Sequence, residues 1–196
     1  MERVSKTFAN ANSFLYFMDE LMLLVDPVSV PEDFPNSLKN KNKKLVTLVT
    51  HAHFDHIQGL GLWQEAAPSG DYFMHVNEIR NLKMAPKYSL LLDRKKMPNF
   101  EKNKIVMLNG SSGKLGDERI EFILLPGHSD GSVIYIDHKG KKVFSGDSCL
   151  KAFVSPNRNQ AGYIQRNTEF IKAHFPGYTL YPGHGKISKV ESSQCL

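Results

Sequence analysis

The chain has 196 residues, of which 41% are hydrophobic and 23% are charged. This length favours one sizeable core, so we expect a single domain over residues 1–196, and the composition excludes a disordered or fibrous chain. The net charge of +5 comes without an aromatic-interleaved basic motif, so nucleic acid is not an expected partner.

Targeting signals are not apparent in the sequence. No apolar stretch approaches the length of a membrane span, and the N-terminus has no basic segment leading into an apolar run. Cys149 and Cys195, the two cysteines, form no CxxC pattern, which fits a reducing compartment. We therefore expect a cytoplasmic protein with a small-molecule substrate and no membrane partner. The sequence also leaves a homo-oligomer open.

The first half of the chain alternates apolar runs with turn residues. Runs at 12–17 and 21–25 predict a hairpin, and the β-branched run at 45–50 predicts a buried strand. A helix is predicted over 56–66, although its glycines oppose it. In the ambiguous stretch that follows, residues 76–84 are the best helix candidate.

The second half returns to short strands, predicted at 120–125, 132–137, 142–145 and 179–181. A helix is predicted over 161–175, because Pro176 and Gly177 follow it. Strands and helices therefore recur in two similar halves, which is compatible with sheets packed inside helical layers.

The segment His51-Ala52-His53-Phe54-Asp55-His56 directly follows the predicted strand at 45–50. In an extended segment alternate side chains share a side, so His51, His53 and Asp55 can converge. A helical turn that starts at Asp55 can bring His56 round to the same place. This segment can therefore supply ligands to two metal ions.

Three later sites share one pattern, an apolar strand followed by a glycine and then His128, Asp147 or His184. A glycine lets the chain turn sharply at the end of a strand, where loops bearing ligands can meet. Each of these residues alone would read as an ordinary polar residue at a strand end. Together with the earlier cluster they give seven His and Asp side chains, which suit a two-metal centre better than a closed, cysteine-rich structural zinc site.

These motifs resemble those of the metallo-β-lactamase fold superfamily, in its glyoxalase II-like and lactonase-like hydrolase branch. The resemblance spans residues 26–185 and implies an αββα sandwich of two mixed β-sheets flanked by helices. It also implies that one metal takes His51, His53 and His128, that the other takes Asp55, His56 and His184, and that Asp147 bridges both.

The resemblance assigns further roles to two aspartates. Asp26 is implied to hold the metal-binding loop in place, whereas the sequence alone fits a turn residue before Pro27 almost as well. Asp55 is predicted to be the catalytic carboxylate as well as a ligand. For the two divalent metal ions we favour zinc, with iron and manganese as alternatives.

Metal ions lower the pKa of bound water from about 15.7 to roughly 7. We therefore predict a metal-dependent hydrolase in which a metal-bridging hydroxide cleaves a small thioester, lactone or related ester. Only eleven residues follow Gly185, so the helical extension with which glyoxalase II enzymes bind glutathione is not expected. One alternative is a persulfide dioxygenase, whose single iron would be held by His51, His128 and Asp147. The other is a phosphodiesterase of the same fold.

The substrate-binding residues are not identified by any motif. Loops at 62–104 and 150–166 are candidates for the pocket walls, and Lys151, Arg158 and Tyr163 are candidates to meet a polar or anionic group. Cys149 is expected to be a packing residue rather than a nucleophile, as are Met84 and Met97.

Overall fold

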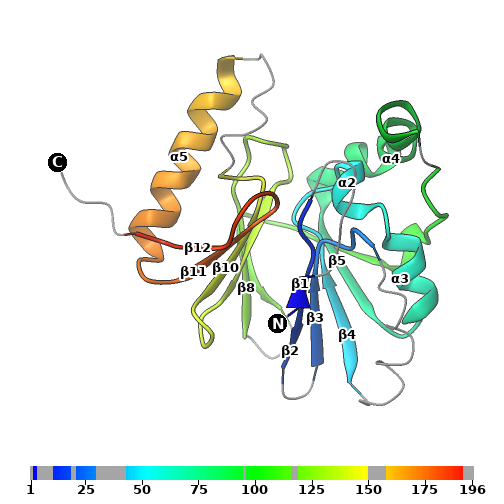
Figure 1. The fold of residues 1–196 in the computed structure, drawn as a ribbon, viewed down its shortest axis with the longest axis horizontal. Coiled ribbons are helices and arrows are strands. Elements are labelled where there is room, and N and C mark those ends of the chain that lie inside the picture. Colours follow the sequence, from blue (N-terminus) through cyan, green and yellow to red (C-terminus); the bar gives the residue numbers. More distant parts are fainter. Residues whose placement is uncertain are drawn as a thin grey trace. The chain divides into compact units, whose positions relative to one another are not determined.

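Two six-stranded β-sheets organise the chain (Figure 1). The computed structural model describes residues 2–3, 11–18, 21–29, 43–94, 96–115, 119–149 and 158–191. They fall into two compact units, Met1–Leu108 and Asn109–Leu196, with one sheet in each. The single domain expected over residues 1–196 stays a prediction.

The sheet of the first unit has the strand order β1-β2-β3-β4-β5-β6. Its strands are β1 (Glu2–Arg3), β2 (Phe14–Phe17), β3 (Leu21–Val25), β4 (Lys44–Leu48), β5 (Asp71–His75) and β6 (Ile105–Leu108). The first three strands pair antiparallel, and β3 to β6 pair parallel. The predicted hairpin is confirmed, with Phe14 opposite Val25 and Phe17 opposite Met22.

Helices follow the parallel strands of this unit. They are α2 (Phe54–Ile57), α3 (Leu60–Ala66), the 3-10 helix η1 (Val76–Glu78), α4 (Ile79–Tyr88), the π-helix η2 (Ser89–Asp93) and the 3-10 helix η3 (Lys102–Lys104). The single helix predicted over 56–66 is wrong, because the amide of Gly59 donates to Pro27 O (2.8 Å) and the chain restarts as α3. The predicted helix at 76–84 is confirmed, but it continues further, through Tyr88.

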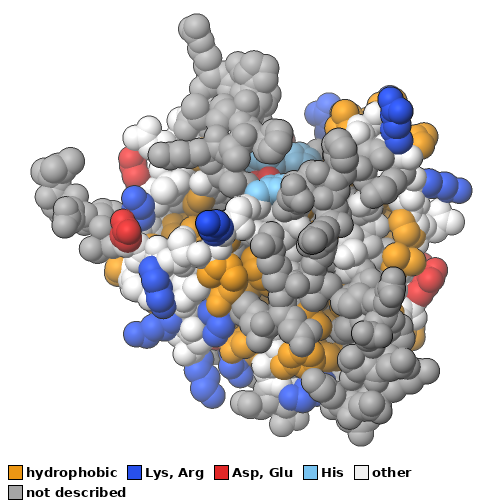
Figure 2. Space-filling model, in the orientation of Figure 1, with side chains coloured by type: hydrophobic (Ala, Val, Ile, Leu, Met, Phe, Trp, Pro, Cys, Tyr) orange, Lys and Arg blue, Asp and Glu red, His pale blue; other side chains and the backbone are white. Residues whose placement is uncertain are grey.

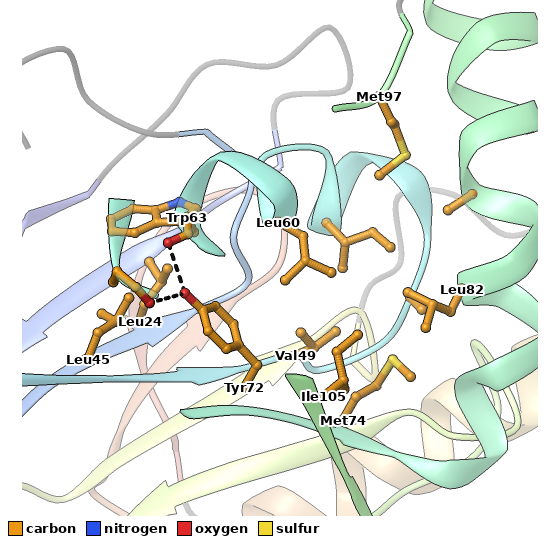
Figure 3. Packing of buried hydrophobic residues seen from close by; sticks show 14 of the residues in the cluster. Leu24, Leu45, Val49, Leu60, Trp63, Tyr72, Met74, Leu82, Met97 and Ile105 are labelled. Atoms are coloured by element: carbon orange, nitrogen blue, oxygen red, sulfur yellow. Dashed lines mark hydrogen bonds between the residues drawn. The ribbon is translucent and has the colours of Figure 1, made fainter. Parts of the chain in front are cut away.

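The core of the first unit lies between the sheet and its helices (Figure 3). Trp63 of α3 and Tyr72 of β5 are both fully buried. The Tyr72 hydroxyl lies 2.8 Å from the carbonyl oxygen of Trp63 and 3.0 Å from that of Ala67, so it ties the end of α3 to β5 (Figure 3). Burial raises the pKa of this phenol above its ordinary value. Met97 belongs to the same cluster, as expected of a packing residue.

The sheet of the second unit has the order β12-β11-β10-β9-β8-β7. Its strands are β7 (Ser112–Leu115), β8 (Ile120–Leu124), β9 (Val133–Asp137), β10 (Lys142–Gly146), β11 (Thr179–Pro182) and β12 (Ser188–Lys189). All pairs are antiparallel except β10 with β11, which the long helix α5 (Arg158–His174) connects. A parallel pair needs such a crossover. Ile171 and Phe175, at the end of this helix, pack in one cluster with the strand residues Ile134 and Val143.

Both sheets mix parallel and antiparallel pairs, and helices flank them. This confirms the fold class that the sequence predicted, two mixed β-sheets with helical layers. Within the described part of the chain, no helix is both long and apolar enough to cross a membrane.

Candidate metal centre

The four expected ligands of the first unit come directly after β4, an interior strand of the sheet. His53 ends the extended stretch and begins α2, with φ −69° and ψ 146°. The ring of His51 lies 4.6 Å from that of His53 and 4.1 Å from that of His56, measured between centroids. Asp55 Oδ2 lies 3.9 Å from His56 Nε2. The first unit therefore brings all four side chains together in a largely buried cluster.

Asp26, at the end of the neighbouring strand β3, holds this loop by its carboxylate. Its Oδ1 accepts from the backbone amide of Thr50 (2.7 Å), and its Oδ2 accepts from the Thr50 hydroxyl (2.8 Å). The same Oδ2 lies 2.9 Å from His56 Nδ1. A carboxylate at this position favours the proton on Nδ1, which leaves the Nε2 lone pair of His56 available to a metal.

Glu78 is a second buried carboxylate beside the loop, and the sequence did not reveal it. Its Oε2 accepts from the backbone amide of Ala52 (2.7 Å) and from Asn81 Nδ2 (3.0 Å). Ala52 separates His51 from His53, so this bond fixes the backbone between two expected ligands. The available signal was the position of Glu78, three residues after β5, on the same edge of the parallel sheet as the His51 loop.

Replacing Glu78 with glutamine is expected to weaken metal binding about tenfold, because the loop loses a charged acceptor while side-chain size is kept. The expected loss of stability is about 1 kcal/mol. Competition with a chromophoric chelator measures the affinity. Glu65→Gln, an exposed exchange of the same type on α3, is the matched control and should bind metal as the wild type does. Equal affinities in the two variants would contradict this role of Glu78.

The three expected ligands of the second unit also lie together. His128 follows β8, Asp147 follows β10, and His184 follows β11. Asp147 Oδ2 lies 3.4 Å from His128 Nε2 and 3.5 Å from His184 Nε2. The second unit therefore presents two imidazoles around one buried carboxylate.

Glycine favours the backbone conformation of two of the three turns that precede these ligands. Gly146 has φ 48° and Gly127 has φ 153°, both rarely adopted by other residues. A Cβ at Gly127 would also lie 2.5 Å from the Cβ of Tyr163, which is closer than two carbon atoms can approach. Tyr163 of α5 therefore packs directly against the turn that precedes His128.

The other residues singled out in the sequence lie apart from these ligands or outside the described residues. Lys151 is not among the described residues, and neither is the side chain of Arg158. Cys149 is partly buried in the core cluster of the second unit, and burial raises the pKa of its thiol to about 11. A thiol with this pKa stays protonated at neutral pH, which fits a packing role.

The donors in the two clusters fit divalent metal ions. Imidazole nitrogen and carboxylate oxygen are ligands that zinc, iron and manganese all accept. Charge supports the same conclusion, because Asp55 and Asp147 bring carboxylates into largely buried surroundings where a nearby cation would stabilise them. The seven side chains therefore suit metal binding, and the assignment of each to a particular ion stays a prediction.

Comparison with known proteins points to one family. A family model described as the metallo-beta-lactamase superfamily matches residues 7–186. The probable metallo-hydrolase YqgX of Bacillus subtilis is 30% identical, and the match covers 94% of this chain and 89% of the relative. The acyl-coenzyme A thioesterase MBLAC2 of Gallus gallus is 28% identical over 72% of this chain and 57% of its own length.

A solved structure shows the same fold. TTHA1623, crystallised in a di-iron-bound form, aligns with a TM-score of 0.79 at 22% sequence identity. The alignment covers 97% of this chain and 95% of that one. At this identity the likeness extends to the fold alone.

Proposed function

The chain belongs to the metallo-β-lactamase superfamily, and from this premise we propose that it is a metal-dependent hydrolase of thioesters. The observation that carries the proposal is the His51–His56 segment, four potential ligands gathered at the end of β4 and held by Asp26. The thioesterase activity named for MBLAC2 supports the substrate class. Lactones and related esters are chemically similar substrates that belong to the same proposal.

We further propose that the two clusters share two divalent ions, with zinc favoured. One ion would be held by His51, His53 and His128, the other by Asp55, His56 and His184, and Asp147 would bridge them. When bound, such ions supply an activated water and polarise the substrate carbonyl. The protein's part is to position the seven expected ligands after strands and in helix α2.

The ligand charges favour acyl transfer. Five imidazoles and two carboxylates would leave two divalent ions with a net charge of about +2, which would favour negative charge on the substrate carbonyl oxygen. Asp55 lines an open pocket, where its carboxylate can accept the proton of the attacking water. A thiolate leaves readily without a proton donor, because its conjugate acid has a pKa of about 8.5. Thioester hydrolysis therefore needs no separate proton donor beside the expected ligands.

A steady-state screen of thioesters, lactones, phosphodiesters and β-lactams with the metal-loaded protein tests the proposal. We expect thioester hydrolysis that falls about 100-fold or more in His53→Ala, because a ligand is lost. His174→Ala, an exposed histidine on α5, is the matched control and should keep full activity.

Three results would contradict the proposal. Activity confined to phosphodiesters would indicate the phosphodiesterase of the same fold. Oxygen consumption with a persulfide, by protein holding one iron, would indicate the dioxygenase. Equal hydrolysis by the His53→Ala and His174→Ala variants would show that the His51–His56 segment has no part in catalysis.

A further inference from the structure

An open pocket of about 360 Å³ lies beside the expected ligands of the first unit. Its lining residues are Ala52, His53, Phe54, Asp55, Asn81, Tyr88 and Leu92. The volume is near the lower end of the range for small-molecule sites. Two expected ligands, His53 and Asp55, therefore line one side of the pocket, and residues of α4 and η2 line another.

The far wall of this pocket is apolar and exposed. Tyr88 ends α4 and is 45% exposed, and Leu92 lies in the π-helix η2 and is 62% exposed. Hydrophobic side chains are exposed on the surface over α4, next to basic ones, as Figure 2 shows. Exposed apolar patches mark binding sites, and π-helical turns occur frequently at functional sites.

Two hydrogen bonds fix this wall to the ligand loop. Gln58, directly after α2, donates by its side-chain amide to the Ser89 hydroxyl at the start of η2 (3.3 Å). Glu78, just before α4, accepts from the amide of Ala52 in the loop (2.7 Å). These bonds hold the start of α4 and the start of η2 beside the ligand loop, and Tyr88 is adjacent to the second of them.

We propose that this pocket binds the acyl chain of the substrate, so that Phe54, Tyr88 and Leu92 select thioesters with a linear alkyl chain. The inference rests on the proposed hydrolase function, because it places the reacting carbonyl at His53 and Asp55. A chain that extends from this carbonyl meets the three apolar side chains of the same pocket. The occupant is thus an alkyl group of medium length rather than a charged or sugar-like group.

Calorimetric titration of the metal-loaded, full-length protein with S-hexyl-pantetheine and S-methyl-pantetheine tests this pocket. These thioethers are uncharged and cannot be hydrolysed, so binding is measured without turnover. Each buried methylene strengthens binding up to about fourfold, so we expect the hexyl probe to bind at least about tenfold more tightly.

Leu92→Ser and Leu91→Ser form a matched pair. Both leucines lie in η2 and both are 62% exposed, but Leu91 does not line the pocket. Leu92→Ser should weaken binding of the hexyl probe about tenfold and leave the methyl probe unchanged, whereas Leu91→Ser should bind both as the wild type does. Leu92→Trp, which fills the pocket, should also weaken the hexyl probe selectively.

Equal affinity for the two probes, or equal effects of the Leu91 and Leu92 substitutions, would overturn the acyl pocket. So would sedimentation in which Leu92→Ser changes only self-association, because a second copy of the chain would then cover this wall. Failure of the hydrolase proposal gives a different pattern, in which chain-length-dependent binding persists but no thioester is cleaved.

Discussion

Asp147→Asn is expected to retain at most one metal ion per chain and to lower thioester hydrolysis by about 100-fold or more, while the fold stays intact. The Asp147 carboxylate lies 3.4 Å from His128 and 3.5 Å from His184, and we propose that it bridges both ions. Two cations held close together repel strongly, and a shared negative charge offsets that repulsion. An asparagine amide has nearly the same shape but lacks the charge.

Elemental analysis of protein purified without chelator measures the metal content, with two ions per chain expected for the wild type. Asp137→Asn is the control, because Asp137 is a fully buried carboxylate of the same sheet without an expected ligand role. It accepts from the amide of Gly140 (2.9 Å) and lies near Arg119 (3.8 Å), so its loss should lower stability without changing metal content. Unaltered metal content and turnover in Asp147→Asn would show that the bridging carboxylate was assigned to the wrong residue.

The parts of the fold predicted correctly are those that local pattern determines. The largely buried strands β4 and β9 are rich in aliphatic and β-branched residues, and the hairpin of β2 and β3 joins neighbours in sequence. The turns before Asp147 and His128 were predicted from a glycine that follows an apolar strand, and the structure places both glycines at positive φ, with a close contact at Gly127. Sequence and structure agree for the elements whose conformation is determined by the residues of the segment itself.

The parts that were missed depend on distant partners. β5 carries Asp71 and His75 at its ends, so its composition does not indicate a strand, and it forms because it pairs in parallel with β4. Without β5, the position of Glu78 on the ligand-bearing edge of the sheet could not be recognised. The sequence placed a candidate pocket wall within residues 62–104, which contain Tyr88 and Leu92, but it did not single out these two residues.

For the candidate site, the sequence singled out the His and Asp side chains that each unit gathers, but not the contacts that orient them. Asp26 was implied by family resemblance, whereas its contacts with Thr50 and His56 became visible only in the structure. A sequence motif shows which potential metal-binding side chains are present. The tautomer of His56 depends on its contact with Asp26, 30 positions away in the sequence, and no local pattern encodes this contact.

Asp26→Asn is therefore expected to weaken binding of the ion assigned to Asp55, His56 and His184 about 10- to 100-fold. It is also expected to destabilise the protein by about 1–3 kcal/mol. Asparagine tolerates the left-handed backbone of this residue (φ 54°), so the change isolates the carboxylate. Its amide oxygen can still accept from the Thr50 amide, but its NH₂ group then faces His56 Nδ1. This favours the proton on His56 Nε2, which removes the lone pair that a metal requires.

Chelator competition measures the metal affinity of Asp26→Asn, and urea unfolding of the metal-free protein measures its stability. Thr50→Val is the informative control, because it leaves the contact of Asp26 with His56 in place. It removes the Thr50 hydroxyl, which donates to Asp26 Oδ2 (2.8 Å) and lies 3.2 Å from His51 Nδ1, so the comparison is made on the ion expected at His56. It should cost stability, by about 1 kcal/mol, without a comparable loss of metal affinity. If both variants lose the same affinity, Asp26 acts by stabilising the loop as a whole rather than by setting the tautomer of His56.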